Sequence, residues 1–180
     1  MTARYVILDR DGTLNIDADD FIKSPAEWQP LPGSLEAVAL LNRHGFKVVV
    51  ISNQSGIARG LFDLPTLHAM HDKMRRLAAG VGAEIEAIYF CPHGPGDDCV
   101  CRKPKPGLFE TFAQEKGVDL QQVYAVGDSF RDIQASQAAG AMPILVKTGK
   151  GRQTLQNHPD LTLPIFENLY DAANYIVSNS

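Results

Sequence analysis

The chain has 180 residues, enough for one domain with a substantial core, and its 44% apolar and 21% charged residues are typical of a globular protein. A net charge of −4 disfavours nucleic-acid binding, which usually needs a basic excess. The N-terminal sequence MTARYVILDRDG lacks the features of a secretory signal, and no apolar run is long enough to span a membrane. We therefore expect one cytoplasmic domain over residues 1–180 with no nucleic-acid or membrane partner. We also expect a monomer, because no obvious apolar stripe is left over.

Strands and helices alternate along the sequence. Apolar runs predict strands over residues 4–8, 46–51, 84–90, 122–127 and 142–147. Helical spacing predicts helices over residues 34–44, 64–79, 106–116, 130–139 and 168–178. Candidate caps are Ser34 and Asp63 at helix starts, and Gly45, Gly117 and Gly140 at helix ends.

This alternation favours a three-layer α/β fold, with a central parallel sheet and helices on both of its faces. Ligands of such folds bind at the carboxyl ends of the strands, near the point where the strand order reverses. Four polar or thiol side chains lie at predicted strand ends, and we expect them to face one crevice: Asp9, Ser52, Cys91 and Asp128.

The first predicted strand leads into the sequence LDRDGTLN, in which Asp9 and Asp11 are separated by one residue. A solvated acidic turn is the simpler interpretation, because acidic residues and glycine favour turns. The position after an apolar strand favours phosphoryl transfer instead. One carboxylate could attack phosphorus, while the other protonates the leaving oxygen and then activates water.

That chemistry needs positive charge. Mg²⁺ with carboxylate ligands could supply it, and GDSFRD offers Asp128, with Asp132 behind it. The basic pair Arg102 and Lys103 could offset charge on phosphorus, although an isolated pair is more often a solvated surface feature. SNQSG, which begins at Ser52, could bind phosphoryl oxygens or could simply be a strand-to-helix turn.

All three cysteines lie in one loop, CPHGPGDDCVC, together with one histidine: Cys91, His93, Cys99 and Cys101. A Cys₃His set fits a closed structural Zn²⁺ site, whereas a catalytic zinc needs an open position. The alternative is a metal-free, partly oxidised loop. Fixing Cys101 would also fix the direction of Arg102 and Lys103. None of the other histidines, His44, His68, His71 and His158, belongs to a ligand-like cluster; His68 and His71 are expected on a helix surface, and Trp28 in the packing.

Together, the D-x-D-G-T sequence, Ser52, Lys103 and the G-D-x-x-x-D sequence resemble the four motifs of the haloacid dehalogenase (HAD) superfamily. Within it, SNQSGIARG and YFCPHGPGDDCVCRKPKPG are similar to the heptose-bisphosphate phosphatases. The histidinol-phosphate phosphatase group is related and carries a similar zinc loop, so it stays as the alternative substrate class. A non-enzymatic zinc module is the alternative of another class.

The resemblance implies a HAD fold with no large cap domain, a zinc loop at residues 91–101, and an aspartyl-phosphate mechanism that removes the C7 phosphate of heptose 1,7-bisphosphate. This step belongs to the synthesis of ADP- or GDP-heptose for lipopolysaccharide core or related glycans. Asp9 would be the nucleophile and Asp11 the general acid and base. The implied Mg²⁺ ligands are Asp9, the Asp11 carbonyl and Asp128. The implied phosphoryl and substrate contacts are Asp17, Asp20, Ser52, Asn53, Gln54, Arg59, Arg102 and Lys103. Two features depart from some family members: Ser129 replaces a basic residue, and the zinc loop is short.

Overall fold

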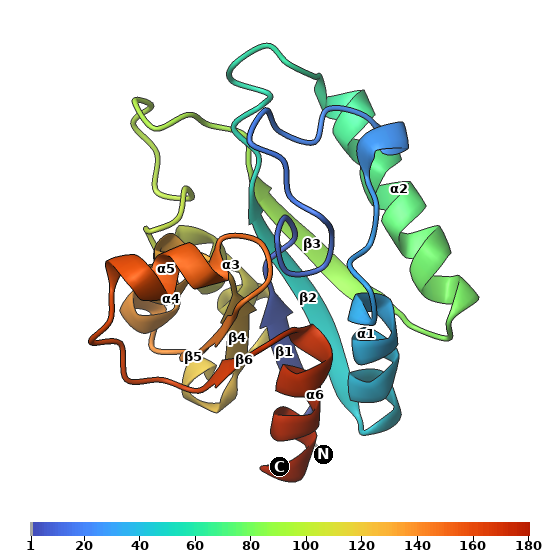
Figure 1. Cartoon of the computed structure of the whole chain (residues 1–180), viewed down its shortest axis with the longest axis vertical. Coiled ribbons are helices and arrows are strands. Elements are labelled where there is room, and N and C mark those ends of the chain that lie inside the picture. Colours follow the sequence, from blue (N-terminus) through green and yellow to red (C-terminus); the bar gives the residue numbers. More distant parts are fainter. Residues whose placement is uncertain (1) are drawn as a thin grey trace.

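The computed structural model describes residues 2–180, in which six parallel strands form one sheet with helices on both faces (Figure 1). The strands are β1 (Arg4–Leu8), β2 (Phe46–Asn53), β3 (Ile85–Cys91), β4 (Tyr124–Gly127), β5 (Met142–Val146) and β6 (Ile165–Phe166). Their spatial order is β3-β2-β1-β4-β5-β6. The order therefore reverses between β1 and β4, and the loops that leave these two strands diverge and open a crevice there.

The helices pack against the two faces of the sheet. One face carries α1 (Ser34–Arg43), α2 (Leu64–Gly80) and α6 (Leu169–Ser178), and the other carries α3 (Gly107–Lys116) and α4 (Phe130–Ala139). A short helix, α5 (Gly151–Asn157), follows β5. The chain also forms two short 3-10 helices, η1 (Pro25–Glu27) and η2 (Leu120–Gln122). The predicted three-layer α/β fold is therefore confirmed.

The central strand β1 shows why the strands appear in the sequence as continuous apolar runs. Val6 and Leu8 pack with α1, α2 and α6, while Tyr5 and Ile7 pack with α3 and α4. Because helices cover both faces, alternate side chains are all buried and no polar alternation remains in the sequence. Trp28 is fully buried, as predicted, among the apolar side chains on the face that carries α1, α2 and α6, and it anchors the segment that follows β1.

Several element ends differ from the prediction. Ser34 is the first residue of α1 and does not cap it; Gly33 occupies the cap position with φ 77°, and the Ser34 hydroxyl donates to the carbonyl of Leu14 at 2.6 Å. The strand β2 runs two residues beyond the predicted end, to Asn53. The helix α5 and the strand β6 were not predicted, because both are short. Within residues 2–180, no helix combines the length and apolar character that crossing a membrane needs.

Candidate active site

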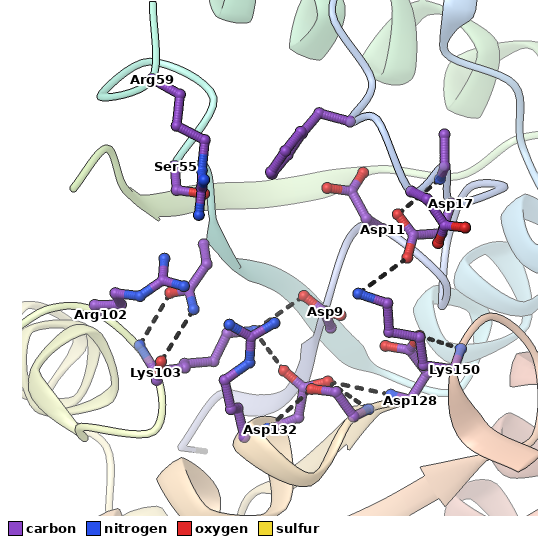
Figure 2. A pocket seen from close by; sticks show the side chains of 16 residues that line it. Asp9, Asp11, Asp17, Ser55, Arg59, Arg102, Lys103, Asp128, Asp132 and Lys150 are labelled. Carbon is purple, nitrogen blue, oxygen red and sulfur yellow. Dashed lines mark hydrogen bonds and ion pairs between the residues drawn. The ribbon is translucent and has the colours of Figure 1, made fainter. Parts of the chain in front are cut away.

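The crevice between β1 and β4 contains a pocket of about 200 Å³ (Figure 2). Asp9 follows β1 and Asp128 follows β4, so the two predicted strand-end carboxylates do meet there. Ser52 and Cys91, predicted to face the same crevice, are buried and lie outside the pocket lining. The lining residues are Asp9, Asp11, Asp17, Ala18, Asp19, Phe21, Asn53, Ser55, Arg59, Arg102, Lys103, Asp128, Ser129, Arg131, Asp132 and Lys150.

Lys103 lies at the centre of the buried charges. Its ammonium donates to Asp9 Oδ1 at 2.9 Å, to Asp132 Oδ1 at 2.7 Å and to the carbonyl of Ile51 at 2.9 Å. Burial alone would lower the pKa of Lys103, but the neighbouring carboxylates outweigh it and raise that pKa above its usual value. Lys103 is therefore a fixed cation, all three of whose donors are used, and a solvated surface position is excluded.

Asp9 and Asp128 are carboxylates that burial and mutual repulsion destabilise. Burial first, and then the charge of Asp132, raise the pKa of Asp9 to about 7. Burial and the charge of Asp9 likewise raise the pKa of Asp128. Carboxylate oxygens of Asp9, Asp128 and Asp132 lie within 4.8 Å of one another. A hard divalent cation would relieve this repulsion, and its preferred ligands are oxygen atoms, so the donor set fits Mg²⁺.

The two Asp132 oxygens already have protein partners. Oδ1 binds Lys103, while Oδ2 accepts from the backbone amides of Asp128 at 3.1 Å and Ser129 at 3.0 Å. The backbone amide of Asp132 donates in turn to Ser129 Oγ, which completes a capping box at the start of α4. Asp132 therefore orients Lys103 and Asp128 with both of its oxygens, whereas within residues 2–180 Asp9 and Asp128 each keep one oxygen that accepts no hydrogen bond from the protein.

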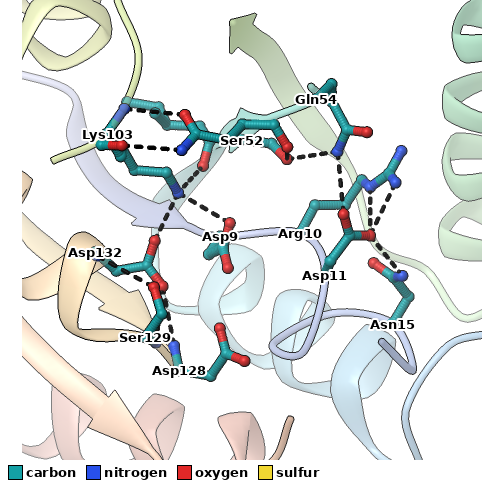
Figure 3. A network of polar contacts seen from close by, with 12 residues as sticks. Asp9, Arg10, Asp11, Asn15, Ser52, Gln54, Lys103, Asp128, Ser129 and Asp132 are labelled. Atoms are coloured by element: carbon teal, nitrogen blue, oxygen red, sulfur yellow. Dashed lines mark hydrogen bonds and ion pairs between the residues drawn. The ribbon is translucent and has the colours of Figure 1, made fainter. Parts of the chain in front are cut away.

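Asp11 lies apart from this carboxylate group (Figure 3). Its Oδ1 accepts from Arg10 Nε and from Asn15 Nδ2, each at 2.9 Å, and its Oδ2 accepts from Gln54 Nε2 at 3.2 Å. The side chain is 25% exposed and lines the pocket. The position suits proton exchange with a bound group, and the expected metal contact of Asp11 concerns its backbone carbonyl rather than this carboxylate.

The three residues at the end of β2 form a polar scaffold. Asn53 accepts from the backbone amide of Lys103 at 2.9 Å and donates to its carbonyl at 3.1 Å, which fixes the loop that carries the lysine. Gln54 is buried and also donates to Ser52 Oγ at 2.8 Å. Asn53 lines the pocket, whereas Gln54 connects Ser52 to Asp11.

Besides Lys103, four basic side chains line the pocket: Arg59, Arg102, Arg131 and Lys150, the last of which lies 3.9 Å from Asp17 Oδ2. Arg59 and Arg102 were predicted as substrate contacts, whereas Arg131 and Lys150 were missed. Arg131 lies in GDSFRD, next to the predicted carboxylates, so the charge pattern of that motif was an available signal. Of the predicted acidic residues, Asp17 lines the pocket, but Asp20 is exposed and pairs with Lys23 at 3.1 Å.

The loop after β5 was also missed, although it touches the site through its backbone. The amide of Lys150 donates to Asp128 Oδ2 at 2.8 Å, and Thr148 donates to the carbonyl of Gly12 at 2.7 Å. Gly149 has φ 55°, and a Cβ there would overlap both the Asp128 carboxylate and the backbone of Gly12. Only glycine permits this approach, which holds Asp128 against the loop after β1.

The four predicted zinc ligands converge. Sulfur atoms of Cys91, Cys99 and Cys101 and Nδ1 of His93 lie within 4.8 Å of one another, and all three cysteines are free. Three thiols and one imidazole suit a closed tetrahedral zinc site. The cluster is linked to the pocket by Arg102, which donates to the carbonyl of His93 at 3.2 Å.

One histidine prediction was wrong. His71, expected on a helix surface, is buried on α2, with its Nε2 3.3 Å from Arg10 Nη1. The helix α2 packs against the sheet, and His71 lies on the side of the helix that faces inward, whereas the prediction had placed it on the solvent side. His158 is half-buried and stacks on Phe130 with 3.6 Å between ring centroids.

Known proteins resemble the chain over almost its whole length. A family model described as HAD-hydrolase-like matches residues 100–172. A D-glycero-beta-D-manno-heptose-1,7-bisphosphate 7-phosphatase of Bordetella bronchiseptica is 56% identical, covering 84% of this chain and 85% of the relative. A Pseudomonas aeruginosa protein of the same name is 49% identical and covers 98% of this chain and 99% of its own. A crystal structure of the D,D-heptose 1,7-bisphosphate phosphatase from B. bronchiseptica, complexed with magnesium and phosphate, has a TM-score of 0.95 at 50% identity, covering 98% of this chain and 99% of the other.

Proposed function

Because the chain belongs to the family of D-glycero-beta-D-manno-heptose-1,7-bisphosphate 7-phosphatases of HAD type, we propose that it removes the C7 phosphate of that heptose bisphosphate. The chain is a phosphoric monoester hydrolase, and this excludes the alternative of a non-enzymatic zinc module. The relatives' names supply the β anomer, which the sequence patterns left open. The heptose 1-phosphate released would enter the synthesis of nucleotide-activated heptose.

The observation that carries this substrate is the group of basic side chains that line the pocket. A bisphosphate would present one phosphate to Asp9 and a second one to the basic side chains of the lining, which are Arg59, Arg102, Arg131 and Lys150. Histidinol phosphate has one phosphate and a cationic amine, so it would leave these basic side chains without a second anionic partner. The geometry therefore favours the heptose bisphosphate over histidinol phosphate.

In the proposed reaction, Asp9 attacks phosphorus, the bond from phosphorus to the sugar oxygen breaks, and Asp11 protonates that oxygen. The resulting aspartyl-phosphate is hydrolysed when Asp11 removes a proton from water, which attacks phosphorus and restores the Asp9 carboxylate. Lys103, held 2.9 Å from Asp9, offsets the charge of the phosphoryl group without reorganising.

Asp9 and Asp128 would hold Mg²⁺, together with the backbone carbonyl of Asp11. When bound, the ion supplies charge neutralisation to an anionic nucleophile that attacks an anionic ester. The pocket is prepared for it, since Asp9 and Asp128 have raised pKa values and the Asp128 carboxylate is fixed by the Lys150 amide.

Zn²⁺ would be held by Cys91, His93, Cys99 and Cys101 in a structural role. All four positions of a tetrahedral ion would then be filled by protein, so no water could be activated there. Its effect on catalysis would pass through Arg102 and Lys103, which follow Cys101 in the chain. The organisation as one monomeric domain remains a prediction, which light scattering after gel filtration would check.

The deciding experiment measures phosphate release, with Mg²⁺, from the heptose bisphosphate and from histidinol phosphate. We expect a higher kcat/KM for the bisphosphate. Replacing Arg131 by Gln should raise KM for the bisphosphate and leave the KM for heptose 7-phosphate, which lacks the second phosphate, unchanged. A preference for histidinol phosphate would contradict the proposed substrate and keep the phosphatase chemistry.

A further inference from the structure

Arg10, between the two motif carboxylates, is a fully buried charged residue. Its Nε lies 2.9 Å and its Nη2 2.8 Å from the same oxygen, Oδ1 of Asp11 (Figure 3). Within residues 2–180, Asp11 is the one carboxylate that pairs with it. A guanidinium removed from water needs an anion with good geometry, so Arg10 and Asp11 hold each other in place.

The far side of Arg10 faces α2, which offers only neutral groups. Nη1 lies 3.3 Å from His71 Nε2 and 3.8 Å from Met70 Sδ. Burial first, and then the charge of Arg10, lower the pKa of His71 to about 3, so the ring is neutral and can accept a hydrogen bond. The helix therefore supports the guanidinium without competing with Asp11 for its charge.

These contacts make the two oxygens of Asp11 unequal. Oδ1 accepts hydrogen bonds from Arg10 Nε and from Asn15 Nδ2 and lies 2.8 Å from Arg10 Nη2 in the ion pair, whereas Oδ2 accepts only from Gln54, at 3.2 Å. Asp11 is part of the pocket lining, while Arg10, with no exposed surface, is not. One oxygen is thus saturated by protein donors, and the other keeps a free lone pair.

We propose that Arg10 is a positioning residue for proton transfer, which fixes Oδ1 of Asp11 and leaves Oδ2 as the oxygen that exchanges the proton. This inference rests on the proposed function, in which Asp11 protonates the leaving sugar oxygen. Arg10 touches neither substrate nor phosphorus. Its contribution is to the direction of the Asp11 carboxylate, which the two-point contact of a guanidinium fixes and an ammonium does not.

The test uses two esters with different needs for a proton. Departure of the alkoxide of heptose bisphosphate needs general acid, whereas 4-nitrophenolate leaves readily without it. For Arg10→Lys, which retains the charge, we expect kcat/KM on the heptose bisphosphate to fall about 100-fold and on 4-nitrophenyl phosphate by less than about tenfold. Asp11→Asn is the reference variant and should show the same selective loss.

The outcomes separate this inference from the proposed function. If wild type turns over neither ester, or if Asp11→Asn loses no activity, the proposed function fails and this inference with it. If Asp11→Asn shows the selective loss while Arg10→Lys loses both esters equally, or neither, only the role of Arg10 is overturned. Should Arg10→Lys fail to fold by near-ultraviolet circular dichroism, Asn15→Ala decides by the same comparison, because it removes another donor to Oδ1.

Discussion

The carboxylate pocket and the cysteine loop are neighbours, because Lys103 of the pocket follows closely after the loop in the sequence. The two regions are nevertheless stabilised in different ways. Asp128 and Asp132 are buried at the junction of β4 and α4 and bound by backbone amides. In the loop, His93 is exposed and Cys99 half-buried, and no helix or strand lies between β3 and α3. The sheet therefore fixes the pocket, whereas the loop depends on its four ligands, so metal loss should disturb the second region more.

The largest effect on turnover is expected for Asp9→Asn, which removes the nucleophile. We expect kcat to fall more than about 10⁴-fold. Because burial and then Asp132 raise the pKa of Asp9 to about 7, a neutral amide relieves repulsion, and the melting temperature of the metal-free chain should not fall. Asp72→Asn, an exposed site on α2, is the matched control for both measurements. A clearly lower melting temperature would show that the fold depends on this carboxylate.

Lys103→Met should damage both activity and stability. It leaves Asp9 and Asp132 without their cation, and breaking a buried pair costs about 3–5 kcal/mol in free energy of unfolding. We expect kcat to fall about 10²–10³-fold, since a fixed charge at the phosphoryl group is lost. Urea unfolding and steady-state kinetics measure these effects. Lys47→Met, which removes an exposed lysine 3.8 Å from Glu86, is the control and should change neither. Unchanged kcat in Lys103→Met would overturn the assigned role.

Removing zinc should have a smaller effect on turnover and a clear effect on stability. In Cys99→Ser we expect loss of bound zinc by elemental analysis, a lower melting temperature and a roughly tenfold lower kcat, because Arg102 and Lys103 lose their anchor. Asp98→Ser, in the same loop but outside the cluster, should keep all three properties. Full activity and unchanged melting of the zinc-free chain would contradict a structural role for the cluster.

The smallest effect concerns pH and the support of Arg10. The folded pKa of His71, about 3, lies below its unfolded value of 6.5, so the unfolded chain binds the extra proton between these values. The stability that neutral His71 contributes is present above pH 6.5 and is lost as the pH falls towards 3. The difference in unfolding free energy between wild type and His71→Gln should thus shrink by up to about 1.4 kcal/mol per pH unit in that window.

Urea unfolding from pH 7 to 4.5 measures this difference. His68→Gln, an exposed histidine on the same helix, reports any effect of placing glutamine on α2. A difference between wild type and His71→Gln that stays constant with pH would show that His71 is not held neutral in the folded chain.

Sequence patterns were enough to predict five of the six strands, most helices and the chemical groups of the site. Strands such as β1 could be predicted because both faces are buried and the apolar run is continuous. Asp9, Asp128 and the four Cys and His ligands could be predicted to converge because parallel strands deliver their carboxyl ends to one edge, and because metal ligands recur at short spacing.

The orientation of these groups depends on contacts that form when the chain folds. Sequence patterns record which residues lie near a strand end, but not what packs against them from distant segments. The Lys150 amide reaches Asp128 from 22 residues away, and His71 on α2 contacts Arg10 from 61 residues away. No local sequence pattern predicts either contact, because each depends on how a loop or helix packs on the sheet. For the same reason Arg10, which looked like a spacer between two aspartates, is a buried charge whose direction and partners the fold alone fixes.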